Sequence, residues 1–292
     1  MRLLVLLHLL LFVASAQSIL LMNSSDNVEK YNQAATAFKE NFHQPIKMIN
    51  ISDMNTKEIK KYLYDEYPDI IYTIGSKSYQ YANRYLPEKT IFFSSIVNWK
   101  RLPLSKNQYG ISNEVYSGMQ LTLIKSIFPK ISSIGVIYSK YTKNIVDSLK
   151  MNAQKLGIKI VAQEVNKESV KKKDFQPLLK ETQALILISD PVLLSEQEVV
   201  KDIFKESAKL NKAIFAYHQL FINYGALLTI SVDNPTIGRQ MATTITDYLQ
   251  KQKISKVQYP IGTKVIFNKR VADKLGISYN ENISFLANEI VE

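Results

Sequence analysis

The feature that most constrains this chain is a unit of short apolar strand, polar cluster and amphipathic helix that recurs through two consecutive halves. Each apolar run is short and rich in β-branched residues, which is typical of buried parallel strands. The runs of the first half are Ser18–Met22, Ile46–Asn50, Asp69–Thr73 and Thr90–Ser94, and those of the second are Ser133–Tyr138, Ile158–Val161, Ala184–Ile188, Ala213–Tyr217 and Ala226–Ile230. Alternating strands and helices with short links predict an α/β fold with a doubly wound parallel sheet in each of two lobes.

At three places in the chain, Gly, Pro or Asn follows a strand-like run. These residues mark a change in the direction of the chain. The three places lie at residues 107–118, 231–234 and 257–262. We interpret them as three crossings between the lobes, which together form a hinge. The predicted N-terminal lobe is 17–113 with 234–258 returning to it, and the predicted C-terminal lobe is 114–233 with 259–292.

Residues 1–16 have the pattern of a secretory signal peptide. Arg2 gives a positive start, Leu3–Val13 is apolar apart from His8, and Ala14-Ser15-Ala16 is a small-residue cleavage site. The apolar run is shorter than the roughly 20 residues of a spanning helix, which favours cleavage over a membrane anchor. The mature chain is therefore expected to be soluble and periplasmic. No cysteine is present for lipidation, disulfides or thiolate metal sites.

The charge of the chain favours a small ligand over nucleic acid. The formal net charge is +11, but Lys171-Lys172-Lys173 is the only tight basic run, and we interpret it as a solvated loop. A nucleic-acid surface needs clustered basic residues, so no nucleic-acid partner is expected. The partners that remain are a small molecule and a membrane protein, and the chain is expected to act as a monomer.

Common enzyme and cofactor motifs are absent from the sequence. It has no HExxH, GxSxG, Walker A or GxGxxG motif, and His43 and His218 are the only histidines after the signal segment. We therefore expect no cofactor, no metal site and no catalysis. His218 is expected to be a hydrogen-bonding side chain, although a Ser-His pair remains an alternative.

Polar and aromatic residues follow the predicted strands in both halves. Ligands of open α/β sheets bind beyond the carboxyl ends of the strands, so these residues are the candidate ligand site. The candidates are Asn23, Ser24, Ser25, Thr73, Gly75, Ser76, Ser95, Asn98, Tyr138, Ser139, Ser189, Asp190, Tyr217, His218 and Asp233.

Two kinds of contact are expected at this site. Helix N-termini beside Asn23, Ser25 and Ser76 favour an anionic group of the ligand, whereas Asp190 and Asp233 suit a cationic or hydroxyl group. Each Ser, Asn or Asp can alternatively cap its own helix, and Asp233 can also pair with Arg239.

Several segments resemble one protein family. They are Tyr109–Ser112, Ile127–Lys130, Ile134–Tyr138, Val232–Ala242 with its Gly-Arg-Gln run, and the tail segments Asn268–Ile277 and Ala287–Val291. They resemble ABC transporter substrate-binding proteins related to the tryptophan/tyrosine-binding type. The resemblance implies a type I periplasmic binding fold that closes on a small polar organic ligand, amino-acid-like or carboxylate, and delivers it to an ABC permease.

A second function fits the same sequence. The closed form of such a protein can instead dock on a membrane signalling protein, which would make the chain a periplasmic sensor subunit. Fold and ligand chemistry are the same in both cases, so the sequence leaves the two open.

Overall fold

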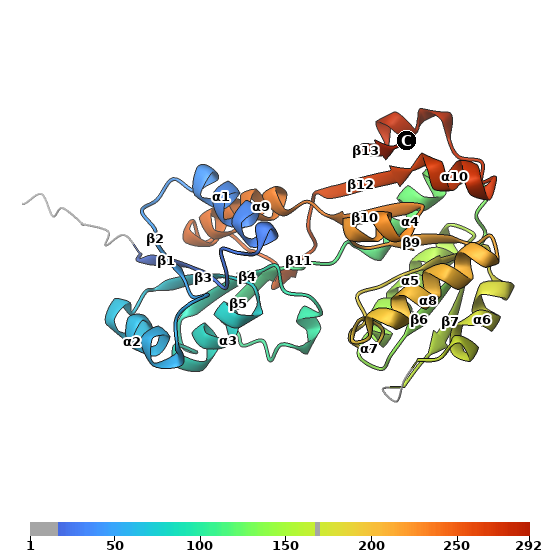
Figure 1. Cartoon of the computed structure of the whole chain (residues 1–292). Helices are drawn as coiled ribbons and strands as arrows, with labels where there is room; N and C mark the ends of the chain where they lie inside the picture. The colour runs from blue at the N-terminus through green and yellow to red at the C-terminus, as the bar shows by residue number, and fades with distance from the viewer. Residues whose placement is uncertain (1–16, 167–169) are drawn as a thin grey trace, which may run out of the picture.

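Two β-sheets, built from separate sets of strands, organise the chain into two lobes (Figure 1). The structure is a computed structural model that describes residues 17–166 and 170–292. The predicted signal peptide lies outside the described residues. Helices alternate with mostly parallel strands in both lobes, which confirms the predicted α/β fold class.

The first sheet has six strands in the order β11-β5-β4-β3-β1-β2, and every neighbouring pair is parallel. Its strands are β1 (Ile19–Asn23), β2 (Lys47–Asn50), β3 (Ile70–Ile74), β4 (Thr90–Ser94), β5 (Gln108–Ile111) and β11 (Val257–Gln258). Strand order reverses between β1 and β3. Such a switch point is where open α/β sheets have room for a ligand.

The second sheet has seven strands in the order β13-β12-β10-β9-β8-β6-β7. They are β6 (Ser133–Tyr138), β7 (Lys159–Glu164), β8 (Ala184–Ile186), β9 (Ala213–Ala216), β10 (Leu228–Val232), β12 (Thr263–Asn268) and β13 (Glu289–Val291). Its switch point lies between β6 and β8. The sheet departs from a purely parallel arrangement at β12, which is antiparallel to β10.

Helices cover both faces of each sheet. The α-helices are α1 (Glu29–Asn41), α2 (Thr56–Glu66), α3 (Ser76–Tyr85), α4 (Ser117–Ile127), α5 (Lys143–Lys155), α6 (Lys172–Glu181), α7 (Pro191–Leu194), α8 (Gln197–Lys209), α9 (Asn234–Leu249) and α10 (Lys269–Leu275). The described residues also form three short 3₁₀ helices, η1 (Trp99–Arg101), η2 (Gln219–Tyr224) and η3 (Glu281–Phe285).

The core of the first lobe is divided by its sheet. Leu21 of β1 packs with α1 and α9 on one face, and Leu20 of the same strand packs with α2 and α3 on the other. Successive side chains of a strand point to opposite faces, so an entirely apolar strand needs helices on both. This explains why β1 has no polar position before Asn23.

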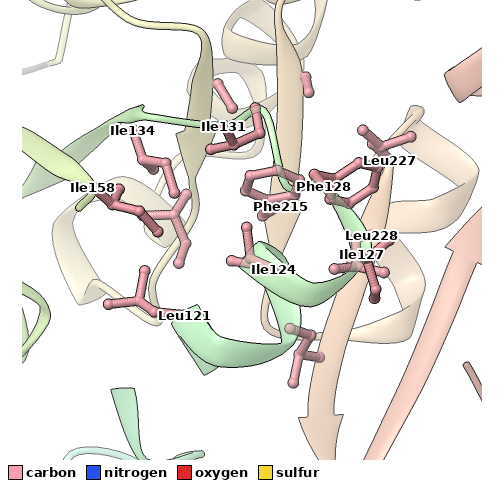
Figure 2. Close-up of a cluster of buried hydrophobic side chains, with 14 of the residues drawn as sticks. Leu121, Ile124, Ile127, Phe128, Ile131, Ile134, Ile158, Phe215, Leu227 and Leu228 are labelled. Carbon is pink, nitrogen blue, oxygen red and sulfur yellow. The ribbon is translucent and has the colours of Figure 1, made fainter. Parts of the chain in front are cut away.

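The second lobe is built in the same way. In Figure 2, side chains of α4 such as Ile124 point toward Phe215 of β9 and Leu228 of β10, and Phe128 continues this cluster beyond the end of α4. The Phe128 and Phe215 rings are stacked with centroids 5.5 Å apart. A separate cluster on the opposite face includes residues of α6, α7 and α8.

Three segments connect the lobes, between β5 and α4, between β10 and α9, and between β11 and β12 (Figure 1). They are tied to one another: Ser112 N–H donates to Gln258 O over 2.8 Å, and Asp233 N–H donates to Gly262 O over 3.2 Å. The Tyr116 and Tyr259 rings, from the first and third connections, lie 5.2 Å apart.

Two local expectations differ from the structure. The Lys171–Lys173 run was expected to be a loop, but α6 begins at Lys172. Asp174 makes this helix start favourable, because its carboxylate accepts the Lys171 N–H over 2.7 Å in a capping arrangement. The α1 helix begins at Glu29 with Val28 before it, so Ser25 does not cap α1.

Candidate functional site

The switch point of the first lobe is occupied by its own polar side chains. Ser24 Oγ accepts the Ser78 N–H over 2.9 Å and lies 3.0 Å from Ser78 Oγ, so it satisfies a backbone donor in the first turn of α3. The buried Asn23 side chain bonds Asn32 and the Ser25 N–H. Both predicted residues therefore hold the loop after β1 in place.

Gly75 and Ser76 stand where β3 meets α3. Gly75 has φ +88°, and a Cβ there would lie 2.7 Å from Ser24 Oγ and 2.8 Å from Tyr31 Cζ. Only glycine fits this conformation and this close approach. Ser76, the first residue of α3, is exposed, and Ser25 Oγ accepts the Asn27 N–H over 3.2 Å.

Two predicted residues belong to the interior of their lobes. Thr73 is fully buried, and its hydroxyl donates to Phe92 O over 3.0 Å within the sheet. Tyr138 is 8% exposed, packs in the core of the second lobe and donates to Glu164 Oε2 over 3.3 Å. These positions lie inside the sheet and its core, which corrects the expectation that both side chains face a ligand.

Asp190 fills the equivalent switch point of the second lobe. One carboxylate oxygen accepts from Ser139 N–H over 2.7 Å, from Ser139 Oγ over 2.8 Å and from the Thr142 hydroxyl. The other accepts from the N–H groups of Val192 and Leu193 in α7. The side chain is 0% exposed. This corrects the expectation that Asp190 and Ser139 present polar groups to a ligand, because their hydrogen bonds are made within the lobe.

Asp233 caps the N-terminus of α9, which is one of the alternatives that the sequence left open. Its carboxylate accepts the Thr236 N–H over 3.0 Å at the start of α9, and Arg239 Nη2 lies 3.5 Å away. Arg239 also donates to the Thr236 hydroxyl over 2.7 Å. The expected contact of Asp233 with a cationic ligand group would have to compete with these partners.

The loop that follows β4, residues 95–107, crosses to the second lobe, and we call it the bridging loop. Asn98 Nδ2 donates to Ser189 O over 3.2 Å, and the Arg101 guanidinium lies 5.0 Å from the centre of the Tyr141 ring. Figure 1 shows this teal loop extending toward α7. Asn98, with φ +55°, is held by Glu114 Oε1, which accepts its N–H over 2.8 Å.

Buried polar atoms without a partner gather around this loop. Within the described part of the chain they include Ser95 Oγ, Trp99 Nε1 and Asn113 Oδ1. Ser95 is 2% exposed and has φ +59°, a strained backbone region for serine. Polar atoms left unpaired at such a place are typical of groups that await a water or a ligand. Trp99 itself packs on the core of the first lobe.

The second lobe presents an aromatic pair beside Ser189. Tyr217 and His218 directly follow β9, and both are half-buried. Burial raises the pKa of Tyr217, and a hydrogen bond with the Ser189 side chain opposes this. His218 Nδ1 accepts the Leu220 N–H over 3.2 Å. Burial, and after it the charge of Lys30, lowers the pKa of His218.

Lys30 and Glu114 are partly buried charged residues that the candidate set from the sequence does not include. Lys30 lies in the first turn of α1, and burial lowers its pKa. Burial also raises the pKa of Glu114, with the Asn98 N–H and Lys100 opposing the shift. Lys30 follows the polar residues after β1 in the chain. A search for candidates at the strand ends would have included Lys30 if it had continued for one more helical turn.

A surface hollow elsewhere on the first lobe is a poor candidate. It has a volume of about 450 Å³ and is lined by residues that include Gln17, Tyr109 and Tyr248. Gln17 precedes β1, so the hollow lies at the amino end of that strand and at the C-terminal end of α9. Ligands of open α/β sheets bind at the opposite edge.

Neither a metal cluster nor a membrane helix is found among residues 17–166 and 170–292. No group of three or more His, Cys, Asp or Glu side chains there is placed to hold a metal ion. No helix in these ranges has both the length and the hydrophobicity needed to cross a bilayer.

The family model for ABC transporter substrate binding proteins matches residues 35–291. The chain belongs to this family. The resemblance seen in the Gly-Arg-Gln run and in the tail is thereby confirmed. A tyrosine-binding protein of Clostridioides difficile (strain R20291) is 23% identical over 227 residues, which are 73% of this chain. The chain spans slightly less than two thirds of that relative, 65% of its length.

Solved structures share the fold. A domain from Streptococcus pneumonia in complex with L-Trp is 17% identical, with a TM-score of 0.60 over 94% of this chain and 100% of the other. The ligand-free, open form of a substrate-binding protein with adhesive properties from Clostridium difficile is 18% identical, with a TM-score of 0.70 over 94% of this chain and 99% of the other. Both support the type I periplasmic binding fold.

Proposed function

We propose that this protein captures a small amino-acid-like or carboxylate ligand between its two lobes and delivers it to an ABC permease. Export through a cleaved signal peptide would place it in the periplasm, where it would act as a monomer. The protein would bind its ligand without chemical change, as substrate-binding proteins of this family do.

The observation that supports this most is the meeting of the two lobes at the carboxyl ends of their strands. Asn98 of the bridging loop bonds Ser189 of the second lobe, and Tyr217 and His218 lie beside Ser189. Ser95 and Trp99, in the same loop, carry buried donors without a partner. Polar groups from both lobes around unpaired donors suit a ligand that is enclosed when the lobes close.

The test is a binding screen on the mature chain. The compounds would be amino acids, organic acids, amines and sugars, with unfolding temperature as the first readout and calorimetry as the second. A ligand at 100 times its Kd stabilises the folded state by about 2.7 kcal/mol, which raises Tm by several degrees. Binding of an amino acid or organic acid with 1:1 stoichiometry, and recovery of that compound unaltered, is expected.

Three results would contradict the proposal. If no compound of the screen bound, or if only sugars bound, the ligand class would be wrong. Conversion of a bound compound into a product would show an enzyme. Delivery is tested separately, by reconstituting the permease and its ATPase in liposomes and measuring ligand uptake with and without this protein.

A further inference from the structure

The bridging loop reaches the second lobe with two residues of one short turn. Asn98 Nδ2 donates to Ser189 O over 3.2 Å. The Arg101 guanidinium lies 5.0 Å from the centre of the Tyr141 ring. Asn98 stands directly before η1 and Arg101 ends it, and the Arg101 N–H donates to Asn98 O over 3.0 Å. Because both contacts come from a single hydrogen-bonded turn, they can form or break together.

The first lobe holds this turn in place. Glu114 Oε1 accepts the Asn98 N–H over 2.8 Å, and Trp99 packs on the core of the first lobe. Asn98 has φ +55°, a left-handed conformation that asparagine tolerates better than most residues. Glu114 belongs to the connection between β5 and α4, where Ser112 Oγ accepts its N–H over 3.1 Å. The turn is therefore fastened both to the core and to the first connection between the lobes.

The surface that receives the turn on the second lobe is also held in place. Ser189 and Tyr141 lie in different loops, after β8 and after β6. The Asp190 carboxylate joins these loops, because it accepts the Ser139 N–H over 2.7 Å and the Val192 N–H over 2.8 Å. The Tyr141 N–H donates to Ser139 Oγ over 3.4 Å. The carbonyl and the ring that the turn contacts are thus fixed relative to each other within the second lobe.

These contacts differ from the three connections in where they join the lobes. They lie at the carboxyl ends of β4, β6 and β8, the edge at which open α/β sheets bind ligands. Two surfaces that are ordered before they meet lose little conformational entropy when they do. A hydrogen bond and a cation–ring contact at this edge can therefore bias the separation of the lobes, although each is weak by itself.

We propose that the turn from Asn98 to Arg101 is a latch that holds the two lobes in the arrangement of this structure when no ligand is bound. Its two contacts favour the latched arrangement over a more open one by about 5- to 30-fold. Opening requires rotation about the connections, and Glu114 ties the latch to the first of them. This inference goes beyond the proposed function, because it concerns the protein before any ligand arrives.

Distances between the lobes test the latch directly. The chain contains no cysteine, so spin labels can be attached to introduced cysteines alone. Ser76→Cys, at the start of α3, and Glu196→Cys, directly before α8, are at exposed positions of the two lobes. Pulsed electron paramagnetic resonance then measures the distribution of distances between the labels in the ligand-free mature chain. Opening of the lobes is expected to add longer distances.

Two variants each remove one contact of the latch. Asn98→Gly keeps the left-handed backbone and the N–H that Glu114 accepts, but loses the amide, so the ratio of latched to open protein is expected to fall about fivefold. Arg101→Gln removes the cation–ring contact and is expected to lower the ratio about two- to fivefold. Lys100→Gln is the control, because it makes the same charge change in the same turn, and Lys100 lies near Trp99 of its own lobe. It should leave the distribution unchanged.

The two possible failures are distinct. Unchanged distributions in both Asn98→Gly and Arg101→Gln, with each variant folded, would overturn the proposal. A shift to shorter distances would also overturn it, because the turn would then be keeping the lobes apart. All these measurements are made without ligand, so their failure would leave the outcome of the binding screen untouched.

The role of Glu114 is tested with a matched pair. Glu114→Ala removes the acceptor of the Asn98 N–H and is expected to shift the distribution in the same direction as Asn98→Gly. Glu114→Gln keeps an acceptor oxygen at this position and should resemble the wild type. A wild-type distribution in Glu114→Ala would show that the latch is not tied to the first connection.

Discussion

The Asp190 carboxylate shows how a residue at a strand end can shape a site without touching a ligand. It joins the loop after β6, through Ser139, to the N-terminus of α7, through Val192. Ser24 does the same in the first lobe, where it joins the loop after β1 to α3. In both lobes the switch point is closed by a polar side chain that satisfies backbone donors, and buried donors need such partners.

Replacing Asp190 tests this structural role. Asp190→Ala is expected to lower the free energy of unfolding by about 2 to 4 kcal/mol, because buried donors on both loops lose a charged acceptor. Asp233→Ala, which removes a half-exposed cap, should cost about 1 kcal/mol. Urea unfolding measures both values. Calorimetry on folded Asp190→Asn separates the effect on stability from the effect on binding. A large loss of affinity with little loss of stability would show that Asp190 contacts the ligand after all.

At the scale of elements, the Gly-Arg-Gln run gives α9 three different contacts. Gly238 lets α9 approach α1, since a Cβ there would lie 2.2 Å from Ala34 O. Arg239 pairs with Asp233 at the helix start. Gln240 donates to Tyr259 O over 3.0 Å and accepts the Ile261 N–H over 3.1 Å, which fixes the third connection between the lobes. The run therefore anchors the connection to the first lobe.

Because α1 and α9 lie so close together, replacing Gly238 by alanine is expected to have an unusual effect on stability. In most helix interiors Gly→Ala stabilises a protein, by roughly 0.5 to 1 kcal/mol. Gly238→Ala is expected to destabilise by about 1 to 3 kcal/mol, because a backbone carbonyl cannot move aside as a flexible side chain can. Thr243→Ala, at an exposed position of α9, should stay within about 0.5 kcal/mol of the wild type. A stabilised Gly238→Ala variant in thermal unfolding would mean that the helices lie further apart.

At the scale of the whole molecule, the three connections and the bridging loop affect the movement of one lobe relative to the other in different ways. The connections are tied to one another by backbone hydrogen bonds such as that from Ser112 to Gln258. Among the described residues, the bridging loop meets the body of the second lobe through the hydrogen bond from Asn98 to Ser189 and the contact of Arg101 with the Tyr141 ring. Such sparse contacts break and re-form at low cost, whereas the connections fix the axis of any motion.

Closure about these connections is expected when the ligand binds. Small-angle scattering of the mature chain should give a smaller radius of gyration with saturating ligand than without it. A compound of the screen that fails to bind, added at the same concentration, is the control. The radius would stay constant if the lobes were already in their final arrangement, and hinge closure would then be wrong.

The apolar strands, and with them the fold class, were predictable because local sequence carries their signal. Runs such as Thr90–Ser94 coincide with β4, and their burial on both faces makes them apolar at every position. The start of α9 at Asn234 was likewise predictable from the Asn-Pro pair. By contrast, β12 and β13 were missed, and β5 and β11 lie in segments that were interpreted as crossings between the lobes. β11 pairs with β5 from a distant part of the chain, which local sequence does not show.

The candidate site was also only partly predictable, for the same physical reason. Sequence placed polar residues at the strand ends, which parallel sheets bring to one edge, and Asn98, Ser189, Tyr217 and His218 do lie where the lobes meet. It could not decide whether a carboxylate such as Asp190 faces outward or bonds its own backbone, because that choice is set by a loop 51 positions away in the chain. The charge of a ligand site depends on which groups remain unpaired after folding, and only the tertiary structure decides that.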